Sequence, residues 1–293
     1  MKQIIFLIII STLFIFSCTE RIELDSELGE DFPPHAVVEG MISTDTMAHV
    51  IKLSWSKPLY NDQEPEKITG ANVKITGNNQ EIILTEEAPG EYYTPENFYA
   101  VEGQRYYLFI DSVDTDNDGN FDPITASDSV PHVEPLDSIH LEWIDPWEAW
   151  AVKAYANEPG DEENFYMFKA FVNDTLVTDT LYEIFVTDDV FFNGEYINGL
   201  EAYFLNEEDT DERLYPNDTV TLKIYALTKP LYEFILRAQE EANYSAPLFS
   251  GPPSNVEHNL KGTNVFGFFM TASVKSAQAI WDTAAIRQSG YHY

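Results

Sequence analysis

The sequence predicts a mostly β protein, with a β-sandwich over residues 35–134 and a second β-rich domain over residues 135–293. Short segments that alternate apolar and polar residues recur along both regions, and turn-forming residues separate them. Only the segment near residues 230–243 changes to a helical period, which predicts one amphipathic helix. The hydrophobic content of 44% allows a sizeable core and argues against a wholly disordered chain.

The first region carries the sandwich pattern. Residues 49–56 place Ile51, Leu53 and Trp55 on one face of a half-buried strand. Asn78 and Asn79 follow a glycine between two further strand-like segments, which is typical of a hairpin turn. Glycine-marked turns also precede two tyrosine-rich segments. Several short strands of this kind favour a sandwich of about 100 residues.

The second region begins near Pro135. Its predicted strands are residues 138–144, 164–172, 181–186, 200–205 and 219–227, with a closing strand over residues 265–274. The helix near 230–243 follows from apolar residues spaced three and four apart: Leu231, Phe234, Ile235 and Ala238. Pro230 stands in the first helical turn, where proline is tolerated.

The N-terminus resembles a bacterial lipoprotein signal. Residues 1–17 combine a short basic start with an apolar run from Ile4 to Phe16, which is shorter than the roughly 20 residues that a membrane span needs. Ser17 precedes the chain's only cysteine, Cys18, which would become the lipidated first residue of the mature protein. The alternative is an uncleaved anchor helix in which Cys18 is incidental.

Residues 18–34 form a predicted acidic tether that ends at Pro33-Pro34. Such a segment fits either a surface-export signal or an ordinary solvated linker. The whole chain has 50 acidic and 16 basic residues, a formal net charge of −34, which disfavours nucleic-acid binding. The same charge opposes adsorption to anionic lipid, so acyl chains on Cys18 would hold the protein at the outer membrane, with exposure at the cell surface as one option.

Several short motifs resemble DUF4249, a family of Bacteroidota lipoproteins. They are Pro34–Ile42, Ile68–Ile75, Gly90–Tyr92, Gly103–Leu108 and the C-terminal set from Pro247 to Phe269. Leu260 and Phe268 depart from the family pattern, which more often has Ile and Tyr there. The resemblance implies an immunoglobulin-like or transthyretin-like N-terminal sandwich. It also implies a lipoprotein found beside TonB-dependent β-barrel transporters, and it transfers no catalytic residue.

One loop has the spacing of a calcium site. Asp114, Asp116 and Asp118 alternate before Gly119, so their carboxylates are expected to converge. Asn120 would add its backbone carbonyl, and Asp122 a direct or water-mediated oxygen. Thr125 stands where an EF-hand has a bidentate glutamate, so the pattern fits the looser calcium loops of extracellular modules, with Asp128 as the candidate closing ligand. The alternative is a solvated acidic hairpin tip.

Two other segments have a binding and a structural interpretation. Trp143, Trp147 and Trp150 lie near acidic residues, a combination that can hold sugar rings, although tryptophan more often packs in a core. The Pro-rich loop 246–255, with the aromatic segment 266–270, would either dock a partner or close the end of a sandwich.

Motifs of catalysis are missing from the sequence. It has no Gly-x-Ser-x-Gly elbow, no His-Glu-x-x-His and no phosphate loop, and its six histidines are scattered. The leading hypothesis is therefore a non-catalytic accessory or ligand-capture subunit of a TonB-dependent transporter. A free-standing, calcium-stabilised surface binding or adhesion module is the alternative, and a hydrolase without a local motif is a third.

Overall fold

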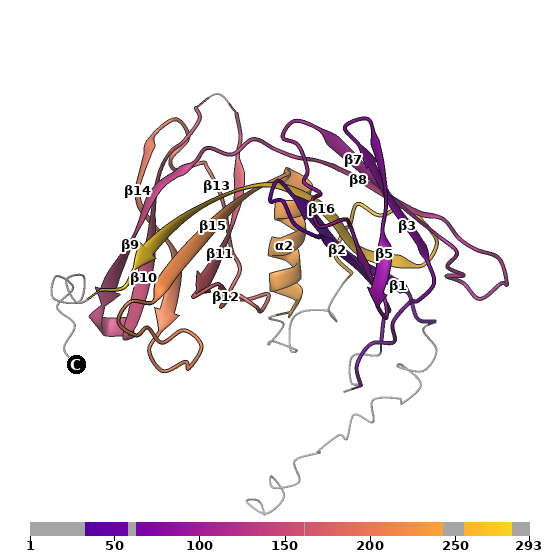
Figure 1. The fold of residues 1–293 in the computed structure, drawn as a ribbon, viewed down its shortest axis with the longest axis horizontal. Coiled ribbons are helices and arrows are strands. Elements are labelled where there is room, and N and C mark those ends of the chain that lie inside the picture. Colours follow the sequence, from indigo (N-terminus) through magenta and orange to yellow (C-terminus); the bar gives the residue numbers. More distant parts are fainter. Residues whose placement is uncertain (1–32, 58–62, 161, 243–254, 283–293) are drawn as a thin grey trace, which may run out of the picture. The chain divides into compact units, whose positions relative to one another are not determined.

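The computed structural model describes residues 33–57, 63–160, 162–242 and 255–282 (Figure 1). The first eight strands are β1 (Ala36–Ser43), β2 (Val50–Trp55), β3 (Asn72–Gly77), β4 (Gln80–Ile83), β5 (Thr85–Ala88), β6 (Glu91–Tyr93), β7 (Arg105–Asp111) and β8 (Ile124–Ser129). The predicted signal peptide, Cys18 and the predicted tether up to residue 32 lie outside the described residues, as does nearly all of the Pro-rich loop.

The remaining elements begin with β9 (Leu136–Ile144) and the 3₁₀ helix η2 (Asp145–Trp147). They continue as β10 (Ala149–Asn157), β11 (Phe165–Val172), β12 (Thr175–Leu176), β13 (Phe185–Asp188), β14 (Tyr196–Asn206), β15 (Thr219–Leu227), helix α2 (Lys229–Ala242) and β16 (Val265–Ile280). Among the described residues, no helix has both the length and the apolar composition needed to span a membrane.

The first region is a β-sandwich, as the sequence predicts. Strands β5, β6, β2 and β1 follow one another in one sheet, and β4, β3, β7 and β8 form the other. Strand β2 buries Ile51 and Leu53 while exposing Lys52, because successive side chains point to opposite faces. These residues join Ile75 and Leu108 from the opposite sheet in one apolar core.

The second region combines a three-stranded sheet, β14-β10-β9, with strands β11, β13 and β15. Strand β15 is almost wholly buried, so its apolar residues contribute to cores on both faces of its sheet. The predicted amphipathic helix is confirmed as α2, which buries Leu231 and Ile235. The predicted fold class, mostly β with an N-terminal sandwich and one helix in the C-terminal region, is thus confirmed for the described residues.

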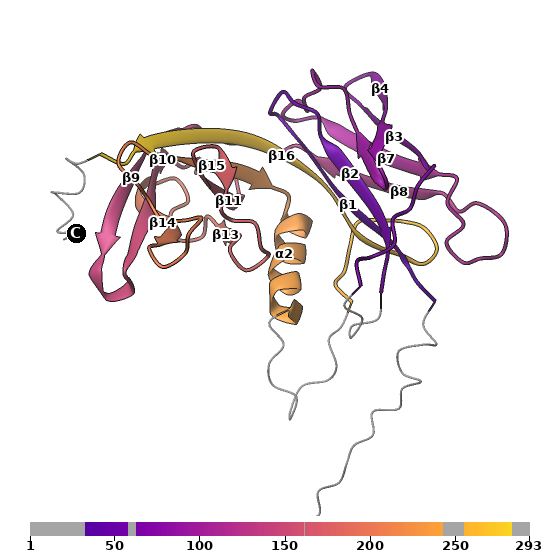
Figure 2. The ribbon, with the colours of Figure 1, turned by 60° about the horizontal axis from the view of Figure 1, so that its bottom comes forward.

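Strand β16 hydrogen-bonds to strands from both regions (Figure 2). Its first half pairs in parallel with β1, from Ala36 opposite Val265 to Ser43 opposite Ala272. Its second half pairs antiparallel with β15. The sequence predicted a closing strand here, but local alternation does not reveal that one strand of 16 residues would serve two partners.

Two of the family-like motifs have a clear structural reason. The Tyr92 hydroxyl donates to the Ile68 carbonyl and accepts the Ala71 N–H, both at 3.0 Å, which ties β6 to the start of β3. The Asn259 side chain pairs with the backbone of Phe269, accepting its N–H at 3.1 Å and donating to its carbonyl at 2.7 Å. In each case a side chain, rather than a neighbouring strand, satisfies these backbone N–H and carbonyl groups.

Candidate functional site

The Asp-rich segment forms the loop between β7 and β8, as the hairpin interpretation expects. The Asp114 carboxylate accepts the N–H groups of Asp118 at 3.2 Å and Gly119 at 2.9 Å. Gly119 has a φ of 88°, a conformation that glycine adopts without steric cost. Asp122 closes the loop by accepting both the N–H and the hydroxyl of Thr115, at 3.0 and 2.8 Å.

Three of the predicted calcium ligands converge. Carboxylate oxygens of Asp114, Asp116 and Asp122 lie within 4.8 Å of one another, and Asp116 is exposed. Hard oxygen donors at this separation fit Ca²⁺. Asp118 instead accepts the backbone N–H and the side-chain amide of Asn120, at 2.8 and 3.0 Å. Asp118 is therefore not one of the three converging carboxylates, and the predicted donor of Asn120 is its backbone carbonyl rather than this amide.

Asp128 does not close the loop, so this part of the prediction is wrong. Its buried carboxylate accepts the Thr271 N–H at 2.9 Å and the Thr228 hydroxyl at 3.0 Å. Burial raises the pKa of Asp128, and these hydrogen bonds oppose the rise. Strand β8 directs this side chain toward β16 and the start of α2, where it has a structural role.

The tryptophan cluster is divided between core and surface. Trp150 is 0% exposed, and its Nε1 donates to Glu207 Oε1 at 2.9 Å. Trp143 is half-buried against Trp150, with ring centroids 5.4 Å apart. Trp147 is 60% exposed, and its ring meets Phe204 edge-on at 4.9 Å. Trp150 cannot stack on a ligand from inside the core, so the binding prediction rests on Trp143 and Trp147.

The aromatic segment 266–270 is part of β16, with β1 as its partner. Phe268 and Phe269 are buried, and Phe268 packs against Phe234 of α2 at 4.8 Å between ring centroids. This packing favours the structural interpretation of the segment over an exposed docking strand.

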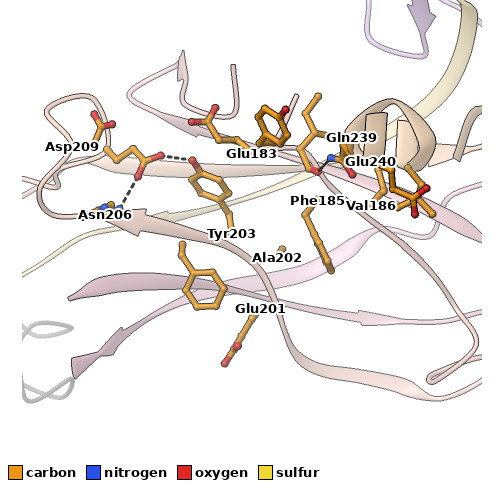
Figure 3. Close-up of a pocket in the computed structure, with 15 residues that line it drawn as sticks. Glu183, Phe185, Val186, Glu201, Ala202, Tyr203, Asn206, Asp209, Gln239 and Glu240 are labelled. Atoms are coloured by element: carbon orange, nitrogen blue, oxygen red, sulfur yellow. Dashed lines mark hydrogen bonds between the residues drawn. The ribbon is translucent and has the colours of Figure 1, made fainter. Parts of the chain in front are cut away.

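A pocket in the second region brings together residues that no single motif contains (Figure 3). Its volume is about 820 Å³, and it is lined by residues of β13, β14, α2 and the loops beside them. Figure 3 shows Asp209 and Asn206 on one side of Tyr203, with Gln239 and Glu240 of α2 on the other. A hollow of this size falls within the usual range for small-molecule sites, roughly 300–1,000 Å³.

A buried acid and a buried phenol line one wall of the pocket. The Tyr203 hydroxyl donates to Glu212 Oε1, and Glu212 Oε2 accepts the Asn206 N–H at 2.7 Å. Burial raises the pKa of Glu212 above its ordinary value, and the negative charges of Asp209 and Glu183 add to the rise. Burial also raises the pKa of Tyr203, helped by its bond to Glu212.

The opposite wall is held by α2. The Gln239 amide donates to the carbonyls of Leu181 and Ile184, both at 2.8 Å. These bonds fix the loop before β13 against the helix, so the half-buried Glu183 and Phe185 take defined positions at the pocket. No local sequence pattern reveals this site, because its lining residues lie in three separated segments, 182–186, 201–212 and 236–240. The only local signal was the mixture of acidic and aromatic residues.

The described residues define a mostly β protein, a sandwich followed by a β-rich region with a pocket. The chain belongs to the DUF4249 family: the model described as "Domain of unknown function (DUF4249)" matches residues 21–278. The resemblance drawn from the motifs is confirmed at this level. A search of curated proteins gave no match.

Two solved structures are similar in part. A two-domain fibronectin type-III segment of chicken tenascin shares 13% identity, with 66% of this chain and 90% of that chain covered and a TM-score of 0.19. A structure described as host cell surface retention of a 1.5-MDa bacterial ice-binding adhesin shares 7% identity, covering 85% and 65% of the two chains, with a TM-score of 0.21. Neither likeness supports an inference about function.

Proposed function

We propose that this protein is a non-catalytic, lipid-anchored outer-membrane protein of a Bacteroidota cell that captures a ligand for a TonB-dependent transporter. The observation that carries the ligand-capture role is the pocket of about 820 Å³ between β13, β14 and α2. The transporter partnership is what the DUF4249 resemblance implies, while the matched family model is described only as a domain of unknown function.

The lipid anchor rests on the N-terminal sequence. The only cysteine, Cys18, follows an apolar run and Ser17, and no acid precedes it in the chain. Two or more acyl chains on one residue are enough for stable membrane attachment. The net charge of −34 supports attachment through lipid rather than through the protein surface.

Binding rather than catalysis is also supported by how the buried acid is held. Both oxygens of Glu212 accept a hydrogen bond, one from Tyr203 and one from the Asn206 backbone. A general acid or base must exchange its proton with a substrate within hydrogen-bond reach. Glu212 is instead bonded to groups of the protein itself, which suits a fixed wall of a binding site.

The first prediction concerns the partner. When the tagged, lipidated protein is purified from mildly solubilised native outer membranes, we expect a stoichiometric β-barrel TonB-dependent transporter in the eluate, read by mass spectrometry. The matched control is Cys18→Ser, which should be lost from the outer-membrane fraction because the lipid attachment site is removed. Recovery of the wild-type lipoprotein alone would contradict the accessory-subunit role.

The Asp-rich loop supports a second candidate, a free-standing calcium-stabilised surface binding or adhesion module. The supporting observation is the convergence of Asp114, Asp116 and Asp122. The exposed Trp147, together with the half-buried Trp143, would be a glycan-contacting surface of such a module. In that case the lipoprotein would bind its ligand stably without a transporter.

The second prediction tests calcium directly. Extracellular calcium modules bind with dissociation constants of about 0.1–1 mM, so we expect calcium at tenfold that level to raise the Tm by about 3 °C. Asp116→Asn should abolish the rise, since it removes one of three converging charges. Asp118→Asn is the matched control from the same loop and should keep most of it. An unchanged Tm and no heat in calorimetric titration would exclude the site.

A further inference from the structure

We infer that the pocket beside α2 takes an organic cation with an apolar body, a primary amine or guanidinium compound being the expected class. This inference names the ligand class of the proposed capture function and rests on it. Three features carry it: the charge of the lining, the aromatic walls, and the buried carboxylate at one wall.

The charge of the pocket is negative. Among the described residues that line it, five are acidic, Glu183, Glu201, Asp209, Glu212 and Glu240, and none is Lys, Arg or His. Glu201 points away from the Tyr203 hydroxyl (Figure 3), and its carboxylate lies 3.6 Å from the Lys153 ammonium. The other four acidic residues line the pocket, and no Lys, Arg or His among the described lining residues offsets their charge. An anionic ligand would therefore be repelled.

The walls suit a partly apolar ligand. Tyr182, Phe185 and Phe204 line the pocket together with Leu236 of α2. Aromatic faces attract organic ammonium and guanidinium groups, by roughly 0.5–2 kcal/mol depending on how far the cation is desolvated. Among the described residues, the acids of the pocket do not form a group of three close enough to hold one metal ion. The lining therefore favours an organic cation over a metal ion.

The Glu212 carboxylate marks where the positive group would lie. It is 8% exposed at the residue level, and Asp209 and Glu183 are close enough to act on it electrostatically. A cation placed among these three acids relieves their mutual repulsion and favours the ionised form of Glu212. Binding should consequently weaken as the pH falls, because Glu212 then takes up a proton.

The test uses matched probes on the unlipidated chain that begins after Cys18. Calorimetric titration would compare phenethylamine with phenethyl alcohol and hydrocinnamate, which share the aromatic body but are neutral and anionic. Spermidine and agmatine extend the cationic set. We expect at least one cation to bind, phenethyl alcohol to bind at least tenfold more weakly than phenethylamine, and hydrocinnamate not to bind. Added salt should weaken the cation's affinity.

Charge-removing variants locate the site. Glu183→Gln and Asp209→Asn should each reduce cation affinity roughly threefold to tenfold, the range expected for one partly exposed charge. Both replacements keep an oxygen that accepts the local N–H, of Thr180 and Asp211 respectively. The matched controls are Glu195→Gln and Asp211→Asn, exposed acids outside the lining, which should leave the affinity within a factor of two.

The outcomes separate the two proposals. Equal binding of the alcohol and the amine, preferential binding of the anion or of calcium, or no binding of any cation at millimolar concentration would overturn the inference. Equal losses of cation affinity in the pocket variants and in their controls would also overturn the inference. None of these results would touch the transporter partnership, which the membrane purification tests independently. Conversely, cation binding by a lipoprotein that purifies alone would leave the inference standing and remove the transporter role.

Discussion

Replacing Gly267 with alanine should destabilise the protein by about 3 kcal/mol, one of the largest effects expected from adding a single methyl group. Gly267 lies in β16 opposite Val38 of β1 and has a φ of 106°. A Cβ at this position would lie 2.0 Å from the Val38 carbonyl oxygen and 2.8 Å from its carbonyl carbon. Backbone atoms of a paired strand cannot rotate away, so the parallel β1–β16 pairing would have to open.

Gly103→Ala is the matched control. Gly103 also has a positive φ, 75°, but a Cβ there would meet nothing within 4 Å. Its replacement should therefore cost only the conformational penalty, about 1 kcal/mol. Urea denaturation of the unlipidated chain would measure both variants. Equal losses at the two glycines would show that the close approach of Val38 has no energetic importance.

Replacing Glu158 should change the pH dependence of stability. Its buried carboxylate accepts hydrogen bonds from the Tyr166 hydroxyl, at 2.8 and 2.9 Å, and from the Asn164 amide at 3.2 Å. Burial raises the pKa of Glu158 to about 7, the hydrogen bonds partly oppose this, and the negative charges of Asp189 and Glu134 add to it. The residue is only 8% exposed, so its ionised form is poorly solvated.

The direction of the pH effect on stability follows from proton uptake by Glu158. The pKa of Glu158 is higher in the folded chain, about 7, than the ordinary value of 4.5 that applies when unfolded. Between these values the folded state binds more protons, so this group's contribution to stability declines as the pH rises through that window. The loss levels off about one pH unit above 7. Glu158→Gln, which carries no charge, should gain about 3 kcal/mol relative to wild type between pH 4 and pH 8.

The measurement is urea denaturation of wild type and Glu158→Gln at both pH values. Taking the difference between the two chains removes other titrating groups, including the buried His49, whose pKa is lowered mainly by burial. Glu195→Gln, an exposed neighbour whose carbonyl accepts the Glu158 N–H, is the control and should show no pH-dependent difference. A constant difference between wild type and Glu158→Gln across the range would refute the prediction.

The local residue pattern was sufficient to predict the strands and the helix that have a strong hydrophobic periodicity. The alternation around Ile51 and Leu53 predicted β2, and the helical spacing of Leu231 and Ile235 predicted α2, because each pattern follows from one face being buried. Motif order was sufficient for the family, which the match over residues 21–278 confirms. The Asp spacing predicted that Asp114, Asp116 and Asp118 would converge, with Asp122 as a further donor, and the structure brings together Asp114, Asp116 and Asp122.

Contacts between segments that are distant in the sequence could not be predicted from the local residue pattern. Asp128 and Thr271 are far apart in the chain, so nothing near Asp128 indicated that its carboxylate would bond to β16 rather than close the loop. The burial of Trp150 depends on the strands that cover it. The pocket joins β13, β14 and α2, and its shape exists only after these elements pack.

The sequence by itself determined that the chain is mostly β, carries a single predicted amphipathic helix, has the motifs of its family and holds a strongly acidic charge. These properties follow from composition and from short-range period. The tertiary structure alone decided that β16 pairs with both β1 and β15, and that carboxylates from separate segments surround one pocket. Long-range pairing decides such features, because it depends on which distant surfaces fit together rather than on any neighbouring residue.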